Sequence, residues 1–271
     1  KAYPNISCFS TTRHGGCSEG NYASFNCTGY CGDEAGHVQR NRDILCELLP
    51  QKPLELIIPH QTHSTNICVI DDTCIGMYGK EALEDIDAVV TQLPGYCLCI
   101  STADCIPVLL YDSTKKVIAA VHAGWRGTVG KIVAKTLATM KERYASEGQD
   151  IKACIGPGIS LAAFEVGDEV YEAFEQAAFP MEEIAEQRPN AAFSVDIAER
   201  ERLAAEGNIV QPLKWHINLP LCNKQILLHC GVAEENIQDC GICTFAHSDE
   251  FFSARKLGIE SGRIYTGILM K

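Results

Sequence analysis

The sequence has no long apolar segment and no excess of basic residues. No stretch of its 271 residues approaches the roughly 18 consecutive apolar residues of a transmembrane helix, and its first residues contain no apolar signal-peptide core. Lysine and arginine total 23 against 35 aspartate and glutamate residues, a formal charge of −12. Because binders of duplex DNA and of anionic membranes need a basic face, we expect no nucleic-acid partner and no membrane partner.

The chain also lacks a repeat, a low-complexity tract and a linker rich in glycine or proline. Its composition, 46% hydrophobic and 21% charged, excludes a disordered chain. A protein of this length buries roughly 75% of the surface that its unfolded form exposes, so a stable core needs no disulfide bonds. We predict a single domain over residues 1–271, and the sequence leaves its oligomeric state open.

Cysteine, by contrast, is abundant, with 15 residues. An odd number cannot pair completely within one chain, and Cys68, Cys97, Cys99 and Cys154 lie inside apolar runs. This pattern indicates reduced cysteines that pack as small hydrophobic residues. It predicts a cytoplasmic location.

Hydrophobic patterning predicts a mixed α and β architecture. Apolar spacings of three and four residues predict helices after Gly130 (from Ile132 to about Tyr144), at Asp168–Ala178 and at Leu221–Cys230. Helices and strands do not alternate strictly, so the α+β class is favoured over a doubly wound sheet. Short apolar or alternating runs predict strands at Ile6–Ser10, Asn66–Ile70, Asp87–Thr91, Cys97–Thr102, Pro107–Asp112, Val117–His122 and Lys152–Ile155.

Three histidines and a cysteine, His60, His63, His122 and Cys105, lie where apolar strands give way to loops, which is where side chains from different strands converge. Their nitrogen and sulfur donors suit Zn²⁺, and three protein ligands would leave a fourth position open. Their spacing matches no short metal-finger pattern, so hydrogen-bonded histidines beside a core cysteine are an alternative. His60 and His63 would lie on opposite faces of a straight strand, so we expect only one of them to be a ligand.

Three glycines, Gly124, Gly127 and Gly130, precede the helix that begins near Ile132, and Arg126 lies among them. Free N–H groups at a helix start and one guanidinium make a plausible phosphate or carboxylate site. A tight turn between strand and helix explains the glycines equally well. A third possibility is a nucleophilic pair of Cys105 and His122, as in a cysteine hydrolase.

Motifs along nearly the whole chain resemble the laccase-domain family of YfiH-like proteins, which are also labelled multicopper polyphenol oxidases or purine nucleoside phosphorylases. The matching segments are Thr12-Arg13-His14-Gly15-Gly16-Cys17-Ser18, Gly32-Asp33, Asn41-Arg42, Gln61-Thr62-His63, Asp87-Ala88-Val89-Val90-Thr91, Ala103-Asp104-Cys105-Ile106-Pro107, His122-Ala123-Gly124-Trp125-Arg126-Gly127, Ile155-Gly156-Pro157-Gly158, Phe164-Glu165-Val166-Gly167, Cys243-Thr244, Phe251-Phe252-Ser253-Ala254-Arg255 and Gly262-Arg263.

The resemblance implies one zinc ion held by His63, Cys105 and His122, which would also be the catalytic residues, whereas His60 has no match in the family motif. It implies a single α+β domain with mixed sheets in α/β/β/α layers. The implied activity is phosphorolysis of adenosine, inosine and S-methyl-5′-thioadenosine, with deamination of adenosine as a second reaction. The partners would then be a purine nucleoside and phosphate.

Arg126 and the glycine-rich helix entry are candidates to hold the phosphate, and Arg13, Asn41 and Arg42 are further candidates for substrate binding. A copper polyphenol oxidase is the alternative that the family labels raise, although the sequence has few His-x-His pairs from which to build a multicopper centre. Two departures from the family pattern concern substrate preference: Asn218 replaces the usual aspartate, and the segment 193–210 is longer than typical.

Overall fold

The computed structural model describes residues 3–71, 83–189 and 212–271, which form two compact units. The larger comprises Lys1–Ser160 and Leu219–Lys271, and the smaller comprises Leu161–Asn218. The predicted insertion at 193–210 lies outside the described residues. No helix among the described residues is long and apolar enough to span a membrane, and their cysteines are all free thiols.

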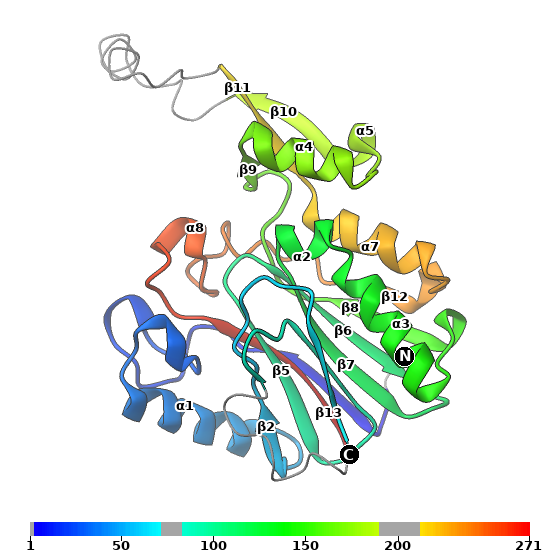
Figure 1. Cartoon of the computed structure of the whole chain (residues 1–271). Helices are drawn as coiled ribbons and strands as arrows, with labels where there is room; N and C mark the ends of the chain where they lie inside the picture. Colours follow the sequence, from blue (N-terminus) through cyan, green and yellow to red (C-terminus); the bar gives the residue numbers. More distant parts are fainter. Residues whose placement is uncertain (1–2, 72–82, 190–211) are drawn as a thin grey trace. The chain divides into compact units, whose positions relative to one another are not determined.

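Two mixed β-sheets form the centre of the larger unit (Figure 1). Most neighbouring strands are antiparallel, while β2–β5, β3–β4 and β8–β12 are parallel pairs. The strand order of the four-stranded sheet is β1 (Ile6–Ser10), β13 (Ile264–Met270), β5 (Tyr96–Thr102) and β2 (Glu55–Ile57). The strand order of the six-stranded sheet is β12 (Ile237–Asp239), β8 (Ile151–Ile155), β6 (Ile106–Asp112), β7 (Val117–Ala123), β4 (Ala88–Thr91) and β3 (Ile67–Ile70).

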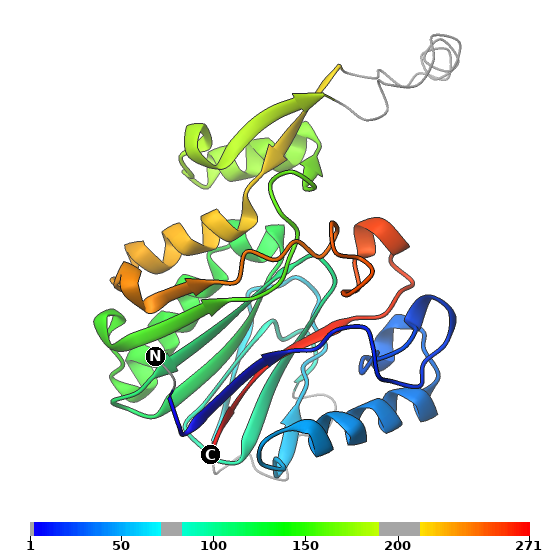
Figure 2. The same ribbon diagram turned by 180° about the vertical axis from the view of Figure 1, so that it is seen from behind.

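Helices cover the outer faces of both sheets (Figures 1 and 2). Helix α1 (Ala35–Leu48) packs Leu45 against Cys97 and Cys99 of the four-stranded sheet. Helices α3 (Ile132–Tyr144) and α7 (Leu219–His229) pack on the six-stranded sheet. The predicted α+β class with α/β/β/α layers is therefore confirmed. The other helices among the described residues of this unit are α2 (Trp125–Val129), α8 (Ala254–Leu257) and the short 3-10 helices Gly20–Tyr22, Gly29–Cys31, Gly148–Asp150 and Glu234–Asn236.

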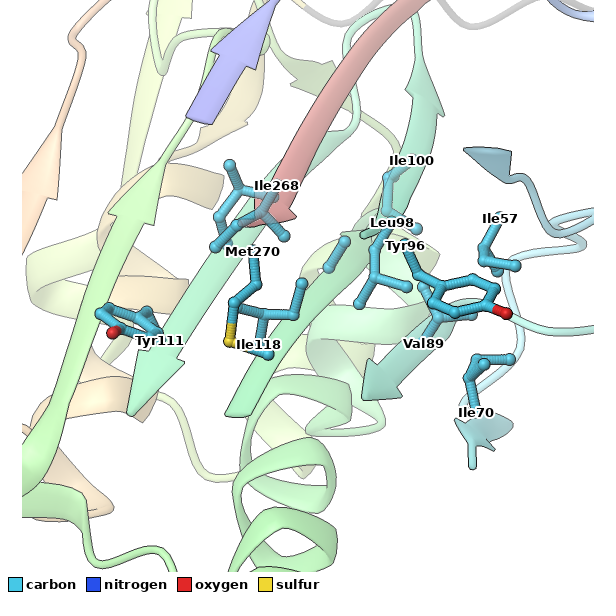
Figure 3. Packing of buried hydrophobic residues seen from close by; sticks show 12 residues of the cluster. Ile57, Ile70, Val89, Tyr96, Leu98, Ile100, Tyr111, Ile118, Ile268 and Met270 are labelled. Atoms are coloured by element: carbon cyan, nitrogen blue, oxygen red, sulfur yellow. The ribbon is translucent and has the colours of Figure 1, made fainter. Parts of the chain in front are cut away.

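The main hydrophobic core fills the space between the two sheets. Leu98 of β5 and Ile268 of β13 meet Val89 of β4 and Ile118 of β7, and all four are buried. Figure 3 shows these side chains converging from strands of both sheets. Burying such residues is the main favourable contribution to folding, so this layer holds the sheets in a fixed relation.

Among its described residues, the smaller unit has an antiparallel sheet of order β10-β11-β9 and two helices. Tyr171 and Trp215 stack with their ring centroids 4.1 Å apart. Asp168 and Glu169 begin its longer helix, where acidic side chains interact favourably with the helix dipole. Its elements are β9 (Glu165–Val166), α4 (Asp168–Gln176), α5 (Met181–Ile184), β10 (Ala185–Pro189) and β11 (Leu213–Ile217).

The predicted strands and helices are present, with ends that differ by at most two residues, but several elements were not predicted. Strand β13 contains Gly267, where a Cβ would lie 2.5 Å from the ring of Phe9, so close packing explains a glycine that interrupts the strand pattern. Helix α1 buries Val38, Asn41 and Leu45. Because the middle residue of this buried stripe is polar, the helical spacing of the apolar residues could not be recognised. The single domain over residues 1–271 stays a prediction.

The prediction that three glycines simply open the helix at Ile132 was wrong. Trp125–Val129 forms the separate short helix α2, with Gly124 at its N-cap. Gly130 and Lys131 then separate α2 from α3, and Lys131 adopts a left-handed φ of 59°. Two helices in succession therefore replace the single glycine-rich entry.

Replacing Leu98 by alanine should destabilise the protein by about 2–5 kcal/mol, because Leu98 is fully buried between the sheets. Guanidinium unfolding would measure the change in the free energy of unfolding. Leu48→Ala is the control, since Leu48 is 72% exposed and should change that free energy by less than about 0.5 kcal/mol. Equal losses in both variants would contradict the assignment of the core.

Candidate metal site

Three side chains with metal-binding atoms lie together in the larger unit. One ligand atom from each of His63, Cys105 and His122 lies within 4.8 Å of the others. His63 Nε2 is 3.6 Å from Cys105 Sγ, and the two imidazole rings are 4.9 Å apart between centroids. Two nitrogen donors and one sulfur donor match the ligand preference of Zn²⁺.

The strand register explains how residues far apart in the sequence meet here. In the antiparallel β6–β7 pair, Pro107 lies opposite His122, so Cys105, just before β6, is at the same edge of the sheet. Strand β4 pairs Ala88 with Val121, which places Asp87 beside His122. His63 precedes β3, which runs parallel to β4.

The buried carboxylate of Asp87 fixes the orientation of two of these side chains. Its Oδ1 accepts a hydrogen bond from His122 Nδ1 at 2.6 Å and one from the main-chain N–H of His63 at 3.1 Å. Its Oδ2 accepts from the N–H groups of Thr62 and Ser64. His63 has a left-handed φ of 66°, a conformation that needs such support. Because Nδ1 of His122 is engaged, its Nε2 is left for a ligand.

Asp104 supports Cys105 in a similar way. Its φ is 92°, and its side chain accepts hydrogen bonds from Thr244 Oγ1 and from the main-chain N–H of Arg255, both at 2.7 Å. The turn that carries Cys105 is thereby tied to two segments from the C-terminal part of the chain.

Gly124 lies against this cluster, and there is no room for a larger residue. A Cβ at this position would lie 2.8 Å from His63 Cδ2 and 3.0 Å from Cys105 Sγ. Real Cβ atoms essentially never approach a neighbour under 3.0 Å, so a side chain at position 124 would displace His63 or Cys105.

Charges and hydrogen bonds within the cluster favour a thiolate at Cys105 and a proton on His122. Burial opposes the Cys105 thiolate, but the charge of His122 and hydrogen bonds with His122 and His63 lower the pKa of Cys105 to about 6. Burial also opposes a charged His122, but the Cys105 thiolate and Asp87 raise the pKa of His122 to about 9. At neutral pH the thiolate required for metal binding is therefore present, and a metal ion would displace a proton from His122.

Two other buried thiols have a raised pKa, in contrast to the lowered pKa of Cys105. Burial raises the pKa of Cys27 and of Cys222 to about 12. These cysteines are neutral packing residues, as the sequence pattern indicated, whereas the Cys105 side chain is activated by its neighbours.

Arg126 and His60 lie outside the His–Cys–His cluster but close to it in sequence. The exposed Arg126 guanidinium stacks over the Trp125 ring at 4.3 Å, two residues beyond Gly124. His60 Nδ1 instead pairs with Glu84 Oε1 at 2.5 Å. Of the two candidate histidines, the structure brings His63 to Cys105 and gives His60 another partner.

Three other predicted substrate-binding residues hold the main chain of the larger unit. Arg13 donates to the carbonyls of Ala23 and Ser248, and Arg42 Nε donates to the carbonyl of Cys27. The fully buried Asn41 makes hydrogen bonds to Ser18, Ser24, Asn26 and Cys17. Substrate binding by Arg13, Asn41 and Arg42 stays a prediction.

Asp87 and Asp104 are the positioning residues that sequence reasoning missed. Both belong to the quoted motifs, but neither received a role. The available signal was a carboxylate one or two residues before a strand that is buried on both faces, since such a carboxylate must find hydrogen-bond partners.

A family model described as "Multi-copper polyphenol oxidoreductase laccase" matches residues 7–271. The chain belongs to this family. A purine nucleoside phosphorylase of Bacteroides thetaiotaomicron is 50% identical over 272 residues, which cover 99% of this chain and 93% of that protein. The adenosine deaminase RL5, from an unknown prokaryotic organism, is 38% identical over 274 residues and covers 100% of this chain and 96% of its own length.

The fold of this family is also known from solved structures. The crystal structure of the protein YfiH from Bacillus licheniformis is 26% identical, with a TM-score of 0.84 over 98% of this chain and 93% of that protein. The resemblance inferred from the motifs is thus confirmed.

Replacing Asp87 by asparagine should weaken zinc binding about 10–100-fold, because the partner that orients His122 and the turn at His63 is lost. Competition with a chromophoric chelator would measure the affinity. Asp239→Asn is the control, since that exposed carboxylate accepts a hydrogen bond from the main-chain N–H of Gly241 and does not belong to the cluster. Unchanged affinity in Asp87→Asn would show that Asp87 does not position the ligands.

Gly124→Ala should keep the fold and lose roughly 10-fold or more in zinc affinity, because the new methyl group displaces His63 or Cys105. Metal content after dialysis, with circular dichroism as the check on folding, would test this. The matched control is Gly36→Ala in α1, where a Cβ meets no atom within 4 Å. Full metal retention in Gly124→Ala would contradict the proposed ligand set.

Proposed function

We propose that this chain is a zinc-dependent purine nucleoside phosphorylase acting on adenosine, inosine and S-methyl-5′-thioadenosine, with adenosine deaminase activity. The observation that carries the proposal is the convergence of His63, Cys105 and His122 within 4.8 Å. The names of two relatives, a purine nucleoside phosphorylase and an adenosine deaminase, support the two reactions.

The residues fit a zinc ion in three respects: the donor set, the carboxylate behind His122 and a glycine at position 124, where a side chain would collide with His63 and Cys105. A zinc ion held by these residues would supply a Lewis acid. In the proposed site His63, Cys105 and His122 hold it, and Asp87 keeps the His122 ring in place.

Phosphorolysis also requires a place for phosphate near the ribose. The exposed guanidinium of Arg126 follows Gly124 closely and is held by stacking on Trp125. A guanidinium binds phosphate through paired hydrogen bonds. We assign Arg126 this role, which gives an anionic cosubstrate a local cation on a protein with a net charge of −12.

A cysteine hydrolase is the second candidate, because Cys105, His122 and Asp87 form a chain of thiolate, imidazole and carboxylate. The two functions differ in what zinc does to Cys105. A metal ligand is protected from iodoacetamide by zinc, whereas a nucleophile that acts without metal is alkylated equally with and without zinc.

Copper is the alternative ion suggested by the description of the family. Among the residues that the structure describes, only one group of three or more histidine, cysteine or acidic side chains could hold a metal. A multicopper centre needs several such groups, so this observation favours a single ion. Elemental analysis of the purified protein identifies the metal directly.

His122→Ala should lose bound zinc and both reactions, since it removes a ligand and the hydrogen bond from His122 to Asp87. The measurements are zinc content and the release of base from adenosine and inosine with and without phosphate. His229→Phe, an exposed change at the end of α7, is the control. Full activity in metal-free His122→Ala protein would refute the proposed function.

A further inference from the structure

The short helix α2 packs directly against the segments that carry the two histidines of the cluster. Gly124, at its N-cap, leaves no room for a side chain beside the ring of His63. A Cβ at Gly127 would lie 3.3 Å from the carbonyl oxygen of His122 and 3.6 Å from that of Ser64, the residue after His63. A displacement of α2 would therefore be transmitted to the main chain at both histidines.

Two fully buried polar side chains connect α2 to the neighbouring helix α7 (Figure 1). Asn223 of α7 donates through Nδ2 to Thr128 Oγ1 of α2 at 3.1 Å and to the carbonyl of Leu219 at 2.9 Å. Thr128 Oγ1 in turn donates a long hydrogen bond, 3.5 Å, to the carbonyl of Ala123. Because Ala123 directly follows His122, a chain of hydrogen bonds runs from α7 to the residue beside this histidine.

Asn223 is a costly residue at its position, and packing does not explain it. The other residues that α7 buries are apolar: Leu219, Cys222, Ile226 and Leu227. Asn223 Oδ1 is buried and has no hydrogen-bond partner among the described residues. A buried polar atom without a partner destabilises a fold, and an apolar residue would avoid that cost. What the asparagine supplies, and an apolar residue would not, is the hydrogen bond to Thr128.

We propose that Asn223 and Thr128 are positioning residues of the metal site. Together they hold α2 against the turn at His63 and against the end of β7, which carries His122. Asp87 fixes the same two segments through its own hydrogen bonds, so two separate sets of contacts hold the ligands in place. This assignment rests on the zinc site of the proposed function.

The test measures zinc affinity separately from stability. Thr128→Val keeps the shape of the side chain and removes the hydroxyl group, which leaves an N–H of Asn223 without its acceptor. We expect zinc affinity, measured by competition with a chromophoric chelator, to fall about 10-fold, and the thermal midpoint of the metal-free protein to fall by several degrees. Thr128→Ser keeps the hydroxyl group and should bind zinc within about 3-fold of wild type.

The double variant Asn223→Leu/Thr128→Val replaces both polar side chains by apolar ones of similar shape. Because neither side chain then has an unpaired donor, we expect the thermal midpoint to recover while zinc affinity stays about 10-fold below wild type. Thr136→Val is the matched control, since Thr136 is also fully buried but its hydroxyl group donates to the carbonyl of Ile132 within α3. This control should retain wild-type zinc affinity.

Three results would overturn this proposal: unchanged zinc affinity in Thr128→Val, zinc affinity that recovers together with stability in the double variant, and an equal loss of zinc affinity in Thr136→Val. Each would show that the pair contributes to stability without positioning the ligands. A wild-type protein that binds zinc but releases no base from any nucleoside would refute the proposed function alone. A wild-type protein that binds no zinc would refute the proposed function and this proposal with it.

Discussion

The candidate site depends on one buried carboxylate. Asp87 accepts hydrogen bonds from three consecutive main-chain N–H groups, from Ser64 Oγ and from His122. Burial alone would raise its pKa, but hydrogen bonds and charge from His122 and bonds from Ser64 hold the pKa of Asp87 below its ordinary value. The charged carboxylate and the turn at His63 therefore stabilise each other. Without the carboxylate the N–H groups of the turn would lose their acceptor, and without these donors the buried charge would be unpaired; either change costs free energy.

The six-stranded sheet holds Asp87 and its hydrogen-bond partners in fixed positions. Asp87, Cys105 and His122 belong to or directly precede β4, β6 and β7, which are neighbours in the six-stranded sheet and are buried throughout. The starts of β3, β4 and β6 and the end of β7 lie at one edge of this sheet. Ligands carried on such strands are held in place before any ion binds, which is the usual condition for a selective metal site.

Much of the fold could be predicted because strands buried on both faces contain unbroken apolar runs. Strand β13 escaped prediction because Gly267 serves close packing against Phe9 rather than a turn. Helix α1 escaped because a fully hydrogen-bonded asparagine, Asn41, occupies its buried stripe. In both cases a tertiary contact, which no local pattern records, decides the residue type.

The sequence by itself determined the family, the α+β class and the three residues that meet in the cluster, because these follow from motifs and hydrophobic periodicity within short segments. Only the tertiary structure decided what Asp87 and Asp104 do, and that His60 pairs with Glu84 and packs against Tyr30. The physical reason is register: hydrogen bonding between strands sets which distant residues face one another, and the spacing along the chain does not contain that information.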